Sequence, residues 1–147
     1  MSVKLEEGVV EMIWKVPLLS LPLIIYNLVA FDIVGDKAHG WAAPFMSLNM
    51  ASGAVWTMSV GDLLIVFALA LLFVEIIKST RIGNASIADH MLSTFVFIAY
   101  LVEFLLVPAA ATSLFFSCMA MSLIDLVAGF SVSIRSAARD VNFGGHG

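Results

Sequence analysis

The sequence predicts an all-α membrane protein that folds as a bundle of four transmembrane helices. Of its 147 residues, 61% are hydrophobic and only 12% are charged, whereas a soluble domain carries about 25% charged residues. The mean hydropathy is +1.04, so too little polar surface is available to coat a water-facing domain. Its apolar runs allow four spans of about 20 residues each, which leaves no length for a second, soluble domain.

The segment boundaries follow from the apolar runs and from the Pro, Gly and charged residues between them. We expect an interfacial helix at 1–15, transmembrane helices at 16–34, 60–78, 88–107 and 112–134, an outer loop at 35–59, a cytoplasmic turn at 79–87, an outer turn at 108–111 and a cytoplasmic tail at 135–147. Pro22 should kink the first transmembrane helix near Ser20 or Leu21, because proline removes a backbone hydrogen bond.

The amino-terminal segment 1–15 has apolar residues on one helical face and charged residues on another. This pattern favours a helix that lies on the membrane surface, where Trp14 and Lys15 would anchor it among the lipid headgroups. The acidic start and the lack of a small-residue cleavage site argue against a signal peptide.

The outer loop at 35–59 shows a period of two that is typical of β-strands. Met46 and Leu48 alternate with polar residues, and so do Trp56 and Met58 after a Ser-Gly turn, which predicts a β-hairpin. Open sheet edges are not tolerated in hydrocarbon, so we expect the hairpin to cap the bundle at the water interface, apolar face down. A re-entrant loop is the alternative.

Basic residues are distributed asymmetrically about this layout. Lys37 alone falls on the outer side, and the other six of the seven Lys and Arg residues fall on the opposite side: Lys4, Lys15, Lys78, Arg81, Arg135 and Arg139. The positive-inside rule therefore predicts that both termini are cytoplasmic. The formal charge of −4 gives no basic surface for a nucleic acid.

Ionisable residues inside predicted spans are the first candidates for function, because each costs at least a few kcal/mol unless it is paired or hydrated. Asp62 and Glu103 should lie at similar depth on the outer side, where they could share a proton or a cation. Alternatively, Asp62 caps its own helix, and Glu103 is protonated or bonded to Asn27 or to the hairpin backbone. Tyr100 lies one turn from Glu103 and could donate to it.

A second group lies at the cytoplasmic interface. Glu75 is one turn from Lys78 and about two turns from Arg81, which predicts a helical ion pair. His90 starts the next span on the same side and could join this network.

Asp125 lies on a stripe of small and polar residues in the last span: Cys118, Ser122, Gly129 and Ser133. Small residues at helical spacing let helices approach closely in lipid, so the stripe should face protein. Asp125 is then a hydrogen-bonded or protonated residue in a helix contact, a proton acceptor in a coupled process, or part of an interface to another subunit.

Motifs for catalysis or cofactor binding do not occur. No Cys and His cluster has metal-ligand spacing, no Ser-His-Asp set converges at one depth, and no Gly-rich phosphate loop precedes a helix. The sequence therefore predicts a protein that is not an enzyme and holds no metal or other cofactor.

Five segments resemble uncharacterised small four-span proteins of the bacterial inner membrane: Gly61–Leu64, Glu75–Arg81, Ala88–Phe97, Leu101–Ala110 and Ala128–Asp140. The resemblance implies that fold and that membrane, but no activity. Two functions remain open. The first is a structural or accessory protein that packs with itself or with a larger membrane complex. The alternative is an oligomeric proton- or cation-linked transporter or channel that uses the intramembrane carboxylates.

Overall fold

The computed structural model describes the backbone of residues 16–34, 40–80 and 84–143, and the side chains of these residues except 84–87, 133 and 136–143. The predicted interfacial helix at 1–15 and part of the outer loop lie outside the described residues. The elements in chain order are α2 (Ser20–Ala30), η1 (Gly40–Ala42), β1 (Pro44–Asn49), β2 (Val55–Ser59), α3 (Val60–Ser79), α4 (Asn84–Leu106), η2 (Pro108–Ala110) and α5 (Ser113–Phe143).

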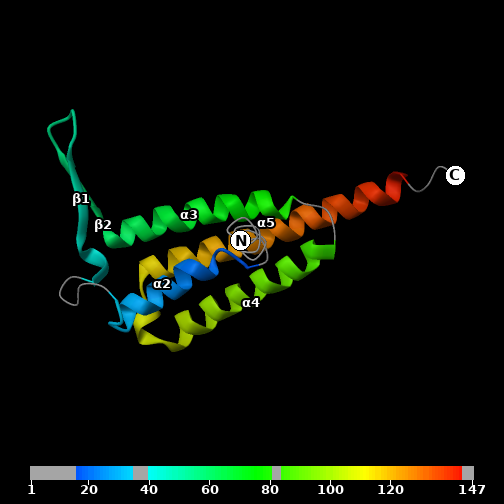
Figure 1. The fold of residues 1–147 in the computed structure, drawn as a ribbon, viewed down its shortest axis with the longest axis horizontal. Coiled ribbons are helices and arrows are strands. Elements are labelled where there is room, and N and C mark those ends of the chain that lie inside the picture. Colours follow the sequence, from blue (N-terminus) through cyan, green and yellow to red (C-terminus); the bar gives the residue numbers. More distant parts are fainter. Residues whose placement is uncertain (1–15, 35–39, 81–83, 144–147) are drawn as a thin grey trace, which may run out of the picture.

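Helix α5 is the centre of the bundle. It packs along both α3 and α4, and α2 lies against α3 and α5 (Figure 1). Helices α3 and α5 run away from the β-hairpin, and α4 runs back toward it. We call the end of the bundle that carries the β-hairpin the hairpin end, and the end where α3 leads to α4 the turn end.

Three of the described helices are long and apolar enough to cross a membrane: Val60–Ser79, Ala88–Leu106 and Ser113–Val132. A helix of 20 residues is about 30 Å long, which matches the hydrocarbon thickness of a bilayer. Large apolar side chains cover their outer faces, among them Phe73, Phe95 and Leu105. These properties describe a membrane protein.

Helix α2 is much shorter than the span predicted at 16–34. It contains 11 residues and is therefore about 16 Å long, too short to cross a bilayer as a helix. Pro22 lies in its first turn, where no intrahelical acceptor is needed, so this proline marks the start of a helix and does not kink one. The helix ends where the amide of Ile33 donates to the carbonyl of Leu28, with Asp32 in the left-handed region at φ 58°, as in a Schellman C-cap.

Two other helix boundaries also differ from the predicted ones. Helix α4 begins at Asn84, inside the turn predicted at 79–87, and α5 continues to Phe143 through much of the predicted tail at 135–147. The last turns of α5 project beyond α3 and α4 (Figure 1). By contrast, α3 and the turn at 108–111 lie close to where they were predicted.

The predicted β-hairpin is confirmed. Strands β1 and β2 are antiparallel, and Met46 pairs with Met58 while Leu48 pairs with Trp56, so these four side chains share one face. On the opposite face the hydroxyls of Ser47 and Thr57 lie 2.9 Å apart in a hydrogen bond.

The prediction that this hairpin caps the bundle with its apolar face down is wrong. All of β1 and most of β2 are exposed, and the ribbon stands away from the helices (Figure 1). The reason is local. Ser59 ends β2 and is also the N-cap of α3, so no connecting residue allows the ribbon to fold back.

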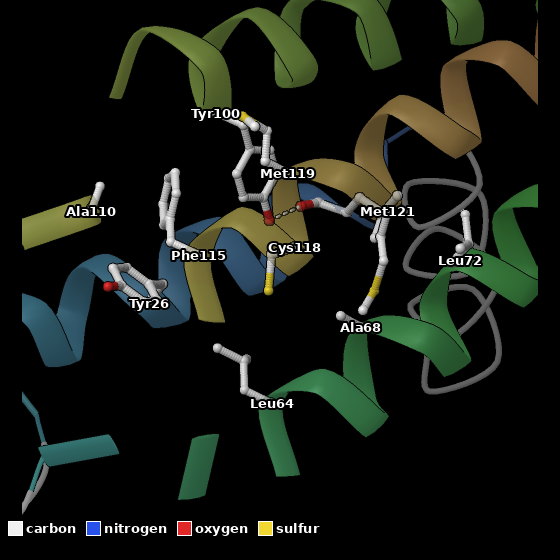
Figure 2. Packing of buried hydrophobic residues seen from close by; sticks show 11 residues of the cluster. Tyr26, Leu64, Ala68, Leu72, Tyr100, Ala110, Phe115, Cys118, Met119 and Met121 are labelled. Atoms are coloured by element: carbon white, nitrogen blue, oxygen red, sulfur yellow. Dashed lines mark hydrogen bonds between the residues drawn. The ribbon is translucent and has the colours of Figure 1, made fainter. Parts of the chain in front are cut away.

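The core at the hairpin end is aromatic (Figure 2). Phe115 of α5 lies between Tyr26 and Tyr100, with ring centroids 4.8 and 5.3 Å away. Both tyrosines are buried, and their hydroxyls donate to backbone carbonyls: Tyr26 to Ala109 at 2.8 Å and Tyr100 to Leu19 at 3.0 Å. The aromatic rings therefore fill the core without leaving their polar tips unpaired.

Candidate functional site

Buried polar side chains from three helices meet toward the turn end of the bundle. They are Glu75 and Lys78 of α3, His90 and Ser93 of α4, and Asp125 of α5, and none is more than 8% exposed. We call these five residues the polar cluster.

Helical rise explains why these residues meet. Measured from the hairpin end of each helix at 1.5 Å per residue, the five positions lie about 18 to 27 Å along the bundle. Glu75 and Lys78 continue the buried face of α3, which also contains Leu64, Ala68 and Leu72. The polar cluster is thus an extension of the apolar core, built from the same faces.

Lys78 is the cation at the centre of the polar cluster. Its Nζ lies 3.3 Å from both carboxylate oxygens of Glu75 and donates to the carbonyl of Val16 at 3.1 Å. The predicted ion pair is therefore present, but its two side chains are only 5% exposed each. It lies inside the bundle and not at an open interface. The predicted third member of this network, Arg81, lies outside the described residues.

Asp125 belongs to the same polar cluster. The Ser93 side chain forms a hydrogen bond with the Asp125 carboxylate. Lys78 and His90 both interact electrostatically with this carboxylate. The carboxylates of Glu75 and Asp125 also interact electrostatically with each other. With its side chain 4% exposed, Asp125 faces protein and not lipid.

The small residues of α5 determine how closely α4 approaches. Cys118, Ser122 and Gly129 are buried on the same face as Asp125, whereas the side chain of Ser133 is outside the described set. A Cβ atom on Gly129 would lie 2.6 Å from Nδ1 of His90, closer than atoms can pack. Glycine therefore makes room for the imidazole, which also stacks on Phe130 with centroids 5.8 Å apart.

The two acidic residues nearer the hairpin end do not form a shared site. Asp62 forms a capping box with Ser59: Oδ2 of Asp62 accepts from the Ser59 amide at 2.9 Å, and the Asp62 amide donates to Oγ of Ser59 at 3.1 Å. Glu103 instead accepts a hydrogen bond from Nδ2 of Asn27 at 3.0 Å. Helix α5 lies between α3 and α4 (Figure 1). The carboxylates of Asp62 and Glu103 therefore bind different residues and do not meet.

Tyr100 does not donate to Glu103, contrary to the sequence-based expectation. Its hydroxyl faces Leu19 (dashed line in Figure 2), because Tyr100 lies on the buried face of α4 whereas Glu103 is only half-buried.

Sequence reasoning separated Asp125 from the Glu75–Lys78 pair and missed Ser93. The last span is predicted to end at residue 134, but α5 continues to Phe143. Ser93 had a usable signal, because it lies one turn from His90 on the same helical face. The Val16 carbonyl had no signal in the sequence, because every residue has a backbone carbonyl.

The polar cluster contains groups that can hold protons, and its residues join three helices. Among the described residues, no three His, Cys, Asp or Glu side chains are grouped as a metal site requires. Comparison with protein-family models, with curated proteins and with solved structures finds no match to this chain.

Proposed function

We propose that this chain is a non-enzymatic structural or accessory protein of the bacterial inner membrane, which associates through its β-hairpin with a second copy or with a larger membrane complex. The observation that carries the proposal is the exposed apolar face of the β-hairpin. Met46, Leu48 and Trp56 on this face are 37%, 47% and 43% exposed.

The composition of the β-hairpin favours a protein partner. No charged residue occurs between Gly40 and Gly61, so the ribbon lacks the charges that normally keep a strand edge soluble. A two-stranded hairpin alone is marginally stable in water, and its open edges are not tolerated in hydrocarbon. A partner chain satisfies both requirements, because it can add a strand to the edge and cover the apolar side chains.

The four-span topology is part of the proposal. Val16 contacts Lys78 toward the turn end, whereas Asn27 contacts Glu103 nearer the hairpin end. Residues 16–34 therefore run along much of the bundle although only Ser20–Ala30 is helical. With the positive-inside rule, a fourth crossing puts both termini in the cytoplasm and the β-hairpin on the opposite side.

The test is the size of the native particle after extraction in mild detergent. We expect the wild type to migrate as an oligomer or with companion proteins, and the double variant Leu48→Ser with Trp56→Ser to migrate as a monomer. Val55→Ser is the matched control, because Val55 is 66% exposed on the other face of the same ribbon. A wild type that is monomeric and without companions would overturn the proposal.

The second candidate function is proton-linked transport by an oligomer. It is favoured by Asp125, which lies buried in a span beside Ser93 and His90, because buried ionisable residues in spans mark proton paths. Its test is proton flux in proteoliposomes with a pH-sensitive dye. Flux must exceed that of empty vesicles and must fall in Asp125→Asn, and wild-type flux equal to that of empty vesicles would exclude this function.

A further inference from the structure

Two methionine side chains face each other across the strands of the β-hairpin. Met46 of β1 is paired directly with Met58 of β2, so both side chains project from the same face of the ribbon. Met46 is 37% exposed and Met58 is half-buried. A small ligand can therefore reach both thioether groups from outside the protein.

The spacing of this pair suits a ligand that both side chains share. Directly opposed residues of an antiparallel pair have Cβ atoms about 4.5 to 5.5 Å apart. A methionine side chain has three rotatable bonds, so the two sulfur atoms can converge above the ribbon while the backbone keeps its position.

The surroundings of Met46 and Met58 indicate the class of ligand. Between Gly40 and Gly61 the sequence contains no Asp, Glu, His or Cys, so no carboxylate, imidazole or thiol of this segment competes with the thioethers. Thioether sulfur is a soft, uncharged ligand that favours Cu(I) over hard ions such as Mg²⁺ and Ca²⁺. Less charge is left uncompensated when uncharged ligands hold a monovalent ion than when they hold a divalent one.

Trp56 supplies a further group that favours a cation. It shares the face of the two methionines and lies diagonally across the ribbon from Met46, a separation that an aromatic side chain can bridge. The face of an indole ring attracts a cation within about 6 Å. For packing alone, Val or Ile would provide apolar area and would also be favoured in a strand.

We propose that Met46 and Met58 bind one soft monovalent metal ion of the Cu(I) class through their sulfur atoms, with the Trp56 indole beside the bound ion. The proposal goes beyond the association through the β-hairpin, because it assigns a ligand to two residues and needs no partner chain. A thioether carries no proton that a metal must displace, unlike a thiol or an imidazolium. Binding should therefore be unchanged between about pH 5 and 8, where histidine changes its charge.

The test is titration of the protein in detergent with Ag(I), which shares the charge and softness of Cu(I) and is stable in air. All variants carry Cys118→Ala, so that no thiol binds silver. The methionine methyl groups are followed by NMR. We expect one equivalent of Ag(I) to shift the Met46 and Met58 signals but not that of Met91, which is 58% exposed on α4. Equal shifts at all three residues, or no shift at Met46 and Met58, would overturn the proposal.

A matched pair of variants and one gain of function locate the site. Met58→Leu removes one sulfur and should weaken Ag(I) binding by at least about tenfold, a loss seen even for residues that only support metal ligands. Met91→Leu makes the same change elsewhere and should not weaken binding. Leu48→Met adds a third sulfur beside the pair and should strengthen it. Undiminished binding in Met58→Leu, or an equal loss in Met91→Leu, would overturn the site.

The same variants separate metal binding from association. Leucine keeps the apolar character of the face, so Met58→Leu should have the native particle size of the wild type while it loses Ag(I). Loss of silver binding without a change in particle size supports a metal site that is independent of the partner. Loss of both together would overturn this independence.

Discussion

The two ends of the bundle differ in which side chains they bury and which they expose. The polar cluster toward the turn end buries charged side chains, and each of Glu75, Lys78 and Asp125 meets a partner from this chain. At the hairpin end, the β-hairpin has no charge and exposes apolar side chains such as Trp56. The buried charges find their partners within this chain, whereas the exposed apolar side chains of the β-hairpin are suited to contact with a partner molecule.

The two ends therefore differ in what their side chains specify: contacts between helices at one end and contacts with a partner at the other. Buried charges are tolerated only in one arrangement, because a displaced partner leaves an uncompensated charge in a medium of low dielectric constant. The polar cluster therefore favours arrangements of α3, α4 and α5 that keep these partners together. Exposed apolar residues impose no such internal arrangement, and their effect appears only when a partner covers them.

The largest effect should follow from removing the cation of the polar cluster. Lys78→Met leaves the buried carboxylate of Glu75 without its cation, and we expect a loss of about 3 to 5 kcal/mol in the free energy of unfolding. The measurement is reversible unfolding in mixed micelles with increasing sodium dodecyl sulfate, followed by circular dichroism.

The control for this prediction is the double variant Lys78→Met with Glu75→Leu. It removes both members of the ion pair, so part of the lost stability should return. If the double variant is less stable than Lys78→Met alone, the two side chains do not act as a pair and the comparison between the two ends fails.

The next effect concerns the contact between α4 and α5. Overpacking in a core costs about 1 to 3 kcal/mol, while replacing glycine by alanine within a helix returns about 1 kcal/mol. Gly129→Ala should therefore destabilise the protein modestly, because its methyl group meets the His90 ring. In a His90→Ala background the same change should stabilise the protein. An equal loss in both backgrounds would show that the ring is not the obstacle.

A smaller effect should come from the aromatic core near the hairpin end. Tyr26→Phe removes the hydrogen bonds to the Ala109 carbonyl and to the Thr112 hydroxyl but keeps the ring against Phe115. We expect a loss of about 1 kcal/mol in the same unfolding assay. A loss as large as that of Lys78→Met would mean that the two ends do not differ in their dependence on polar pairing.

The smallest effect on stability should come from the β-hairpin. Leu48→Ser with Trp56→Ser changes only exposed side chains, so the unfolding free energy of the isolated protein should shift by less than about 0.5 kcal/mol. A clear destabilisation of the monomer would show that the β-hairpin contributes to the fold of the bundle as well as to association.

Local patterns were sufficient for several elements. The alternation around Leu48 and Trp56 predicted the β-hairpin, and the position of Asp62 two residues into its apolar run allowed a helix cap. The stripe of small residues around Asp125 predicted a face that packs on protein. Each of these depends on neighbours within a few residues, so the sequence contains the relevant information.

Predictions that needed a second segment were less successful. From the sequence, Glu103 on the same helix is an available acceptor for the Tyr100 hydroxyl. Only the position of α2 shows that the Leu19 carbonyl is the acceptor instead. The orientation of the β-hairpin depended on whether a connecting residue precedes α3, and the structure has none. The polar cluster depends on the relative depth and rotation of three helices, which the sequence of each helix does not specify.

Hydropathy and short-range periodicity are properties of the chain alone, so they were enough to predict a helical membrane protein with a small β-hairpin. Tertiary packing was needed to place α5 between α3 and α4 and to bring Asp125 together with Lys78 and His90. These features depend on how helices are rotated and shifted against each other. Many rotations satisfy the same hydropathy, and only packing selects one of them.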